Sequence, residues 1–291
     1  MLNKKLWLII GGTGRLGRSL QSYLAKNAIE YIAPISSELD IRNFKNARNY
    51  IFESRPSVVI NCSGWTNVRE AENNTEDAYL LNGYSVGNLI NICDEISCVF
   101  AHISTDYVFS GSKRTPYLTG DEIDPINKYG VSKALGEKLI IESGAEKFYI
   151  FRTAWLYGEF GTNFIKTIIA KYKSGEKQIQ VVNDQFGSPT YVTDLASKIV
   201  ESIKIELPYG IYHTVNSGQA SWYDLATTTI KYLGQNSNVI IGVKSSENSN
   251  EVQRPSNSTL DTKKWKTLGI SEMRPWEEAL KFAIPHIVQN M

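Results

Sequence analysis

The chain has 291 residues, of which 42% are hydrophobic, and its 31 basic and 30 acidic side chains give a net charge of +1. No run of Lys or Arg forms a stripe for a nucleic acid, and no apolar run reaches the roughly 18 residues that a membrane span needs. The three cysteines, Cys62, Cys93 and Cys98, lack metal-binding or redox spacing, so we expect free thiols in a cytoplasmic protein without a metal site.

The first predicted element is a strand over residues 6–11, followed by a glycine turn and a helix. Gly11, Gly14 and Gly17 are spaced three apart, and apolar residues recur at helical spacing from residue 16 to residue 24. Such a turn lets the backbone approach a diphosphate, and the N-terminus of the helix favours the anion. Glycine turns also join strands to helices where no ligand binds. With its strand and helix, the turn predicts a dinucleotide site made by Gly11, Thr13, Gly14, Arg15, Leu16 and Gly17.

Strand-like runs then alternate with helical patterns, over residues 31–35, 58–61, 99–104 and 149–152. This alternation predicts an α/β fold, a Rossmann-like doubly wound parallel sheet with helices on both faces. Beyond residue 152 the elements are shorter. We expect an NAD(P)-binding domain over residues 1–152, and over residues 153–291 a smaller α/β substrate-binding lobe that returns some segments to the sheet. The later pattern predicts lobe helices at 163–172, 193–203, 221–233 and 275–283 and a solvated loop at 245–249.

The chemistry is expected from Tyr129 and Lys133, which are four residues apart and therefore share one face of a helix. An ammonium beside a phenol favours the phenolate, so we expect Lys133 to lower the pKa of Tyr129 and make it a general acid. Thr105 follows the strand at 99–104, at the sheet edge where ligands bind. The alternative has no catalytic site: the helix is amphipathic and exposes Tyr129 and Lys133 to solvent, and Thr105 only ends a strand.

Further segments in a characteristic order extend this pattern over residues 5–282. They are STDYVF at 104–109, YGVSK at 129–133, RTAWLYG at 152–158, NF at 163–164, DQFGSPT at 184–190, GIYH at 210–213, SWYD at 221–224 and RPSNS at 254–258. In these segments the chain resembles the extended short-chain dehydrogenase/reductases, and within them the dTDP-4-dehydrorhamnose reductases. The resemblance implies reduction of the C4 ketone of dTDP-4-dehydro-L-rhamnose to dTDP-L-rhamnose by NADPH or NADH.

The resemblance also implies roles for single residues. Thr105, Tyr129 and Lys133 would be the catalytic set. The dTDP-sugar would contact Thr105, Asp106, Tyr107, Trp155, Asn163, Gln185, Thr190 and Arg254. Besides the glycine turn, the dinucleotide would contact Ser36, Asp40, Ile41, Asn61, Cys62, Ser63, Asn82, Tyr129 and Lys133. No acidic residue stands at the tip of the second strand, near residues 35–37, which leaves both cofactors open and favours NADPH slightly.

Proteins with this scaffold have several other functions, which the sequence disfavours or leaves open. A dehydratase of the group usually has Thr-Asp-Glu where this chain has Thr105, Asp106 and Tyr107, so a second proton carrier is missing and reduction is favoured. An epimerase would retain NAD tightly. Trp65 and Arg69 depart from the family pattern, so another 4-keto-6-deoxyhexose nucleotide is an alternative substrate. A non-catalytic NADP-binding regulatory subunit, like that of methionine adenosyltransferase, is the alternative from another class. Both a monomer and a homodimer are compatible with the sequence.

Overall fold

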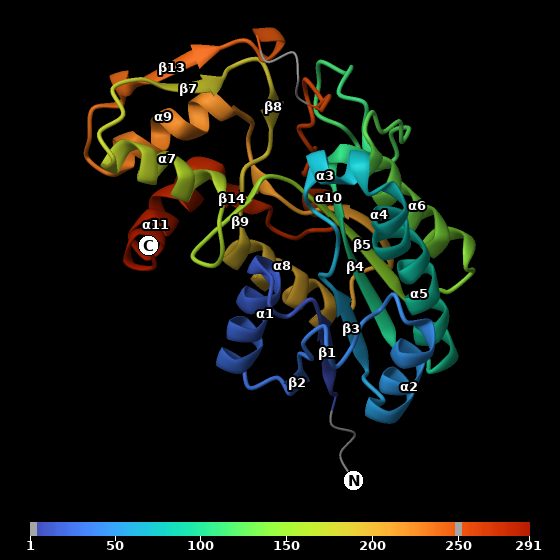
Figure 1. The fold of residues 1–291 in the computed structure, drawn as a ribbon. Coiled ribbons are helices and arrows are strands. Elements are labelled where there is room, and N and C mark those ends of the chain that lie inside the picture. The colour runs from blue at the N-terminus through green and yellow to red at the C-terminus, as the bar shows by residue number, and fades with distance from the viewer. Residues whose placement is uncertain (1–4, 248–251) are drawn as a thin grey trace.

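The computed structural model describes residues 5–247 and 252–291 and is built around one six-stranded sheet (Figure 1). All five strand pairings in this sheet are parallel. Because β1 has β2 on one side and β3 on the other, the chain changes its direction across the sheet at β1, and ligands of such sheets bind beside this point. The predicted doubly wound sheet is confirmed, in the spatial order β10 (Gly210–His213), β5 (Phe148–Thr153), β4 (Val99–Thr105), β3 (Val58–Asn61), β1 (Trp7–Ile10) and β2 (Tyr31–Ile32).

The two faces of the sheet are covered by different helices (Figure 1). Side chains alternate along β1, so Trp7 and Ile9 pack toward α1 (Arg15–Lys26), whereas Leu8 and Ile10 pack into the core on the opposite face. That second core is completed by helices on the other side of the sheet, α2 (Phe44–Ser54), α5 (Ser85–Glu95) and α6 (Lys128–Glu142). Burial on both faces explains why the strands are almost continuously apolar.

The helix expected at 193–203 lies in a different place from the one predicted. It is α8 (Val192–Lys204), and its apolar residues Leu195 and Ile199 pack with α1 in the core on one face of the sheet, outside the lobe. The periodicity of its apolar residues shows that the helix has one buried face. It does not show which surface that face covers, so the assignment to the lobe was wrong.

The remaining segments form a lobe beside the sheet, seen at the upper left of Figure 1. Its apolar centre lies between helices and a two-stranded parallel pair, β7 (Ile179–Val182) with β13 (Ile240–Val243). The helices are α7 (Phe164–Lys173), α9 (Trp222–Tyr232) and α11 (Trp276–Gln289). Three short pairs connect it to the sheet: β6 (Leu156–Tyr157) with β9 (Thr190–Tyr191), β8 (Phe186–Gly187) with β12 (Ala220–Ser221), and β11 (Asn216–Ser217) with β14 (Met273–Pro275).

Several bounds differ from those expected. β2 ends at Ile32 rather than at residue 35, because Pro34 has no N–H for a ladder hydrogen bond and the chain turns at Ile35. α11 runs beyond residue 283 to Gln289 and contains Pro285, because Ile284 and Ile287 bury its last turns. Residues 245–247 form a short 3-10 turn, and the rest of the loop expected at 245–249 lies outside the described residues. The other short helices are α3 (Val68–Asn73), α4 (Thr75–Tyr79), a π-helical turn (Leu80–Tyr84), α10 (Lys263–Thr267) and two 3-10 turns, Asp106–Val108 and Ser237–Val239.

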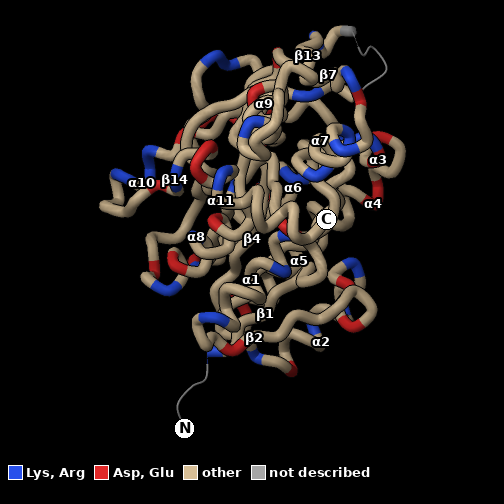
Figure 2. The backbone as a smooth tube through the Cα atoms, turned by 90° about the vertical axis from the view of Figure 1, so that its left-hand side faces the viewer, with Lys and Arg blue, Asp and Glu red and all other residues tan. Residues whose placement is uncertain are grey.

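Charges of both signs are interspersed over the surface in the view of Figure 2. Within residues 5–247 and 252–291, every helix is too short or too polar to cross a bilayer. The same residues contain no cluster of three His, Cys, Asp or Glu side chains with the proximity that a metal ion requires.

Candidate functional site

A cavity of about 1130 Å³ lies at the carboxyl ends of the central strands. Its lining comes from the glycine turn after β1, the loop after β3, the end of β4, the first turns of α6 and the lobe. This is the edge at which doubly wound sheets bind ligands. Of the predicted site residues, the cavity brings together Thr13, Gly14, Arg15, Leu16, Gly17, Cys62, Ser63, Thr105, Asp106, Tyr107, Tyr129, Lys133, Trp155 and Arg254.

Two glycines of the turn, Gly11 and Gly17, pack too closely to carry a side chain. Gly11 has a φ of +79°, and a Cβ there would lie 2.6 Å from the backbone nitrogen of Ser63. A Cβ on Gly17 would collide with the carbonyl oxygen of Gly11 and lie 2.7 Å from the Cα of Gly12. Helix α1 begins after Gly14, which offers no side-chain cap to its first N–H groups. An uncapped helix N-terminus behind a close-packed glycine turn fits the diphosphate of a dinucleotide.

Arg15 connects this turn to the lobe. Its guanidinium lines the cavity and donates a hydrogen bond to the carbonyl of Thr162, in the link before α7. Burial lowers its pKa. Thr162 had no role in the sequence prediction, because nothing in the sequence pairs two positions 147 residues apart.

Thr105 and Tyr129 meet where β4 ends against α6. Asn127 caps α6 by accepting a hydrogen bond from the backbone of Gly130 at 2.8 Å. A Cβ on Gly130 would collide with the carbonyl of Tyr107, so the helix approaches the end of β4 as closely as glycine permits. This contact positions Tyr129 beside the hydroxyl of Thr105, which also donates to the Asp106 carboxylate at 3.0 Å.

The expected effect of Lys133 on Tyr129 is wrong for the structure described. Burial raises the pKa of Tyr129 to about 12, opposed by a hydrogen bond with Thr105 and reinforced by the charge of Asp106. The Nζ of Lys133 instead donates to the carbonyl of Ile103 at 2.6 Å and lies 3.0 Å from His102 Nε2. Burial also lowers the pKa of Lys133 to about 8. Its spacing from Tyr129 placed it on the correct helix face, but it could not reveal these competing partners.

Asp106 is the other ionisable group at this point. It is 2% exposed, and burial raises its pKa to about 7 against the opposing effects of hydrogen bonds with Ser258 and Thr105. A carboxyl group that titrates near neutrality therefore lies beside the Thr105 hydroxyl.

Aromatic side chains form the wall of the cavity toward the lobe. Trp155 and Trp222 stack with ring centroids 3.5 Å apart and planes 5° from parallel, and both line the cavity. Tyr107 and Arg254 lie on the same cavity, with a hydrogen bond between their side chains. The sequence pattern singled out Trp155 and gave Trp222 no role. Ser221 and Asp224 form a capping box at the start of α9, which fixes the position of Trp222. This motif is the one signal in the sequence that could have located Trp222.

The other predicted site residues do not line this cavity, and several have internal partners. Asn163 caps α7 by accepting from Lys166, and Thr190 donates to the carbonyl of Ser188 at 3.0 Å. Gln185 lies between β7 and β8. Their predicted contacts with a sugar nucleotide stay predictions.

The same holds on the dinucleotide side. Asn82 is hydrogen-bonded to Trp65 and Ser132, and Asp40 pairs with Arg42, which holds the pKa of Asp40 below its usual range. Three further residues lie outside the lining: Ser36 is exposed, Ile41 is buried in the core beside the sheet, and Asn61 is buried behind Ser63. Their predicted dinucleotide contacts are likewise untested.

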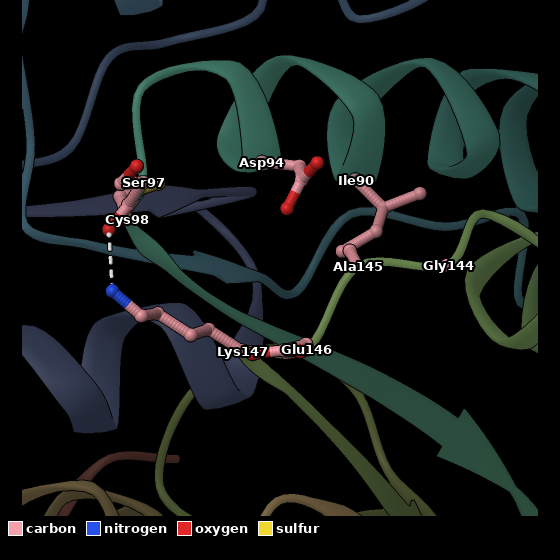
Figure 3. A pocket seen from close by; sticks show the side chains of 8 residues that line it. All are labelled: Ile90, Asp94, Ser97, Cys98, Gly144, Ala145, Glu146 and Lys147. Atoms are coloured by element: carbon pink, nitrogen blue, oxygen red, sulfur yellow. Dashed lines mark hydrogen bonds between the residues drawn. The ribbon is translucent and has the colours of Figure 1, made fainter.

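A second, smaller cavity of about 350 Å³ lies at the opposite edge of the sheet, between the end of α5 and the link from α6 to β5 (Figure 3). Lys147 reaches across it and donates to the carbonyl of Ser97 at 3.4 Å, and Asp94 points into it. It contains none of the predicted site residues.

Comparison with known proteins agrees with the fold. A dTDP-4-dehydrorhamnose reductase of Streptomyces griseus is 36% identical over 96% of this chain and 93% of its own. A dTDP-4-keto-6-deoxy-D-glucose reductase of Streptomyces niveus is 35% identical over 96% of both chains. The crystal structure of a dTDP-4-dehydrorhamnose reductase from Bacillus anthracis in complex with NADP superposes with a TM-score of 0.92 at 34% identity, covering 97% of this chain and 99% of that one.

A family model described as the RmlD substrate binding domain matches residues 5–288, nearly the whole chain. Together with relatives that are more than 30% identical over almost their full length, this match means that the chain belongs to the RmlD substrate binding domain family.

Proposed function

We propose that the protein reduces the C4 ketone of dTDP-4-dehydro-L-rhamnose to dTDP-L-rhamnose with NADPH or NADH. The observation that carries the proposal is the convergence of Thr105, Tyr129 and Lys133 on the same cavity as the glycine turn. The names of the two relatives and the NADP in the similar crystal structure support it. We also propose that the enzyme is cytoplasmic and acts as a monomer or a homodimer.

The dinucleotide would lie along the glycine turn, with its diphosphate at the N-terminus of α1 and Arg15 beside it. Ser63 and Lys133 would contact the nicotinamide half, because both line the cavity farther along the sheet edge. When bound, the reduced nicotinamide supplies the hydride that C4 of the sugar receives. The remaining chemistry belongs to side chains of this protein.

Tyr129 is the proton donor. Since burial keeps its pKa at about 12, the hydroxyl holds its proton at neutral pH until the ketone oxygen gains negative charge. That oxygen then takes the proton from Tyr129. The hydroxyl of Thr105 turns its one proton from the Asp106 carboxylate to the same oxygen and fixes its position. One hydride and one proton added to the ketone give the alcohol, which balances the reaction.

The sugar nucleotide would occupy the lobe side of the cavity. The stacked indoles of Trp155 and Trp222 offer a flat apolar wall to a sugar or base, and the guanidinium of Arg254 offers a fork to the diphosphate. Asp106 and Tyr107, which line the same cavity, would flank the ketone.

A second substrate of the same class is supported by two cavity residues. Trp65 and Arg69, where the chain departs from the family pattern, both line the cavity. The relative from Streptomyces niveus is named for a different 4-keto-6-deoxy sugar nucleotide. A reductase of another such sugar nucleotide is therefore the alternative.

A product-resolved assay separates these functions. The protein is incubated with dTDP-4-dehydro-L-rhamnose and each reduced cofactor, and the product sugar is identified by NMR. We expect dTDP-L-rhamnose from the wild type and at least about 100-fold slower formation by Tyr129→Phe. Tyr84→Phe, at a side chain 54% exposed, is the matched control and should keep full activity. A protein that binds NADPH but reduces neither this nor another 4-keto-6-deoxy sugar nucleotide would be a binding subunit, and NAD that stays bound through purification would indicate an epimerase.

A further inference from the structure

A buried polar chain behind the cavity joins Lys133 to Ser63, and the proposed reaction does not use its two inner members, His102 and Asn61. Lys133 Nζ lies 3.0 Å from His102 Nε2 on β4, and His102 Nδ1 lies 3.3 Å from the Asn61 amide nitrogen on β3. The Asn61 carbonyl oxygen accepts from the backbone N–H of Ser63 at 3.1 Å and from its hydroxyl at 2.6 Å. His102 and Asn61 are fully buried, so solvent water cannot replace the contact between them.

The chain has a fixed direction, which begins at Ser63. A backbone N–H only donates, so the Asn61 atom that faces Ser63 must be the carbonyl oxygen. The Asn61 amide nitrogen, a donor, therefore faces His102 Nδ1, which must accept. A neutral imidazole with an accepting Nδ1 carries its proton on Nε2. That proton points at the Nζ of Lys133.

An ammonium has no lone pair and would oppose this proton, whereas a neutral amine accepts it. The neutral amine also keeps an N–H for the carbonyl of Ile103, at 2.6 Å. With a neutral Lys133, every contact from Ser63 to Ile103 joins a donor to an acceptor. With a charged Lys133 one contact must fail, in a place where an unsatisfied group is costly.

We infer that His102 is a positioning residue that favours the uncharged form of the Lys133 amine in the dinucleotide-free protein and leaves the amine to gain a proton when a dinucleotide binds. The first half depends only on the side chains of the buried chain, and the second half rests on the proposed function.

Burial favours the uncharged amine, and the neighbouring groups oppose it with smaller effects. Burial lowers the pKa of Lys133, while Glu137 on α6 and Cys62 after β3 raise it by smaller amounts. The charge of Glu137 is already paired with Arg152, at 2.7 Å. Burial also moves the pKa of His102 well below its ordinary value, which keeps the imidazole neutral.

The test is the titration of Lys133 itself, followed by NMR of the dinucleotide-free protein with isotope-labelled lysine side chains. The Lys133 signal is assigned by its absence from Lys133→Arg. We expect its midpoint to lie at least about one pH unit below those of the exposed lysines. A Lys133 midpoint equal to theirs would overturn the inference.

Two variants address the mechanism through His102. Asn61→Asp places an acceptor beside His102 Nδ1, which reverses the tautomer and makes His102 Nε2 an acceptor. His102→Gln is a neutral change that offers Lys133 a carbonyl oxygen. Both should raise the Lys133 midpoint by about one pH unit or more. His213→Gln, at another buried histidine of the sheet, is the control and should leave it unchanged. Unchanged midpoints in whichever of the two variants fold would also overturn the role of His102.

Calorimetry separates this inference from the proposed function. NADPH binding near the Lys133 midpoint, measured in buffers of different ionisation enthalpy, should show fractional proton uptake that falls in Asn61→Asp. Binding without proton uptake would contradict the second half of the inference. A low Lys133 midpoint in a protein that neither binds NADPH nor reduces the sugar nucleotide would leave the role of His102 standing and reject the proposed function.

Discussion

The indole of Trp155 stacks on the ring of Trp222, 3.5 Å away, and its edge lies against Gly187. A Cβ on Gly187 would approach the Cζ2 atom of Trp155 to 2.6 Å. Trp155 also has a φ of +46°, a left-handed conformation that is costly for a bulky residue and persists only where packing fixes it. The lobe thus holds one aromatic face at a fixed angle to the cavity.

The first prediction concerns that face. Trp222→Ala removes the support of Trp155, and we expect the KM for the sugar nucleotide to rise about 10-fold, the cost of one aromatic pair. The dissociation constant of NADPH, measured by fluorescence titration, should not change. Trp222→Phe keeps a stacking partner and should lose much less. Equal weakening of both ligands would mean that the stack supports the whole site.

The second prediction tests the glycine turn. Gly17→Ala forces a methyl group against the Gly11 carbonyl, so the turn must open and NADPH binding should fall by at least about 100-fold. Gly120→Ala is the matched control, because a Cβ there meets no atom within 4 Å. Calorimetric titration and circular dichroism together distinguish lost binding from lost folding. Unchanged binding in a folded Gly17→Ala protein would remove the dinucleotide from this turn.

Much of the fold was readable from the sequence because local signals determined it. Alternating strand and helix patterns predicted the parallel sheet, and the bounds 58–61 match β3. The placement of α8 was not readable, because its buried face meets α1 across a sequence distance that periodicity does not encode. The same limit applies to the site. Spacing along one helix found Tyr129 and Lys133, whereas the partners of Lys133 on β4 follow only from strand register.

The third prediction concerns pH and Asp106. Its pKa is raised to about 7 in the folded protein, so the folded state binds the proton more tightly than the unfolded state, and stability is lost as pH rises from about 4 to 7. Asp106→Asn lacks this loss, and its stability relative to wild type should grow by about 3–4 kcal/mol over that range. Denaturant unfolding at pH 4.5, 6 and 8 measures the difference.

Asp121→Asn should change the pH dependence of the free energy of unfolding in the opposite direction. A hydrogen bond from Lys113 holds the pKa of Asp121 below its usual range, so Asp121 adds stability above that range and loses it as pH falls. Parallel pH curves for wild type and Asp106→Asn would show that the Asp106 carboxyl does not titrate as described.

The fourth prediction concerns the ion pair behind the site. Arg152 and Glu137 are 1% and 0% exposed and joined at 2.7 Å, and the pair connects β5 to the helix that carries Tyr129. Arg152→Met leaves an uncompensated buried carboxylate and should lower the free energy of unfolding by about 3–5 kcal/mol. Adding Glu137→Leu should recover a large part of this loss in urea unfolding. A double variant as unstable as the single one would assign the cost to packing instead of charge.

The most direct test of the whole account follows the transferred hydrogen. The protein is given dTDP-4-dehydro-L-rhamnose with NADPH deuterated on the transferring face of C4, and the product is examined by NMR and mass spectrometry. The account predicts dTDP-L-rhamnose with one deuterium at C4 of the sugar, formed by wild type and at least about 100 times more slowly by Tyr129→Phe. Deuterium at another carbon, or a Tyr129→Phe protein as fast as wild type, would contradict it.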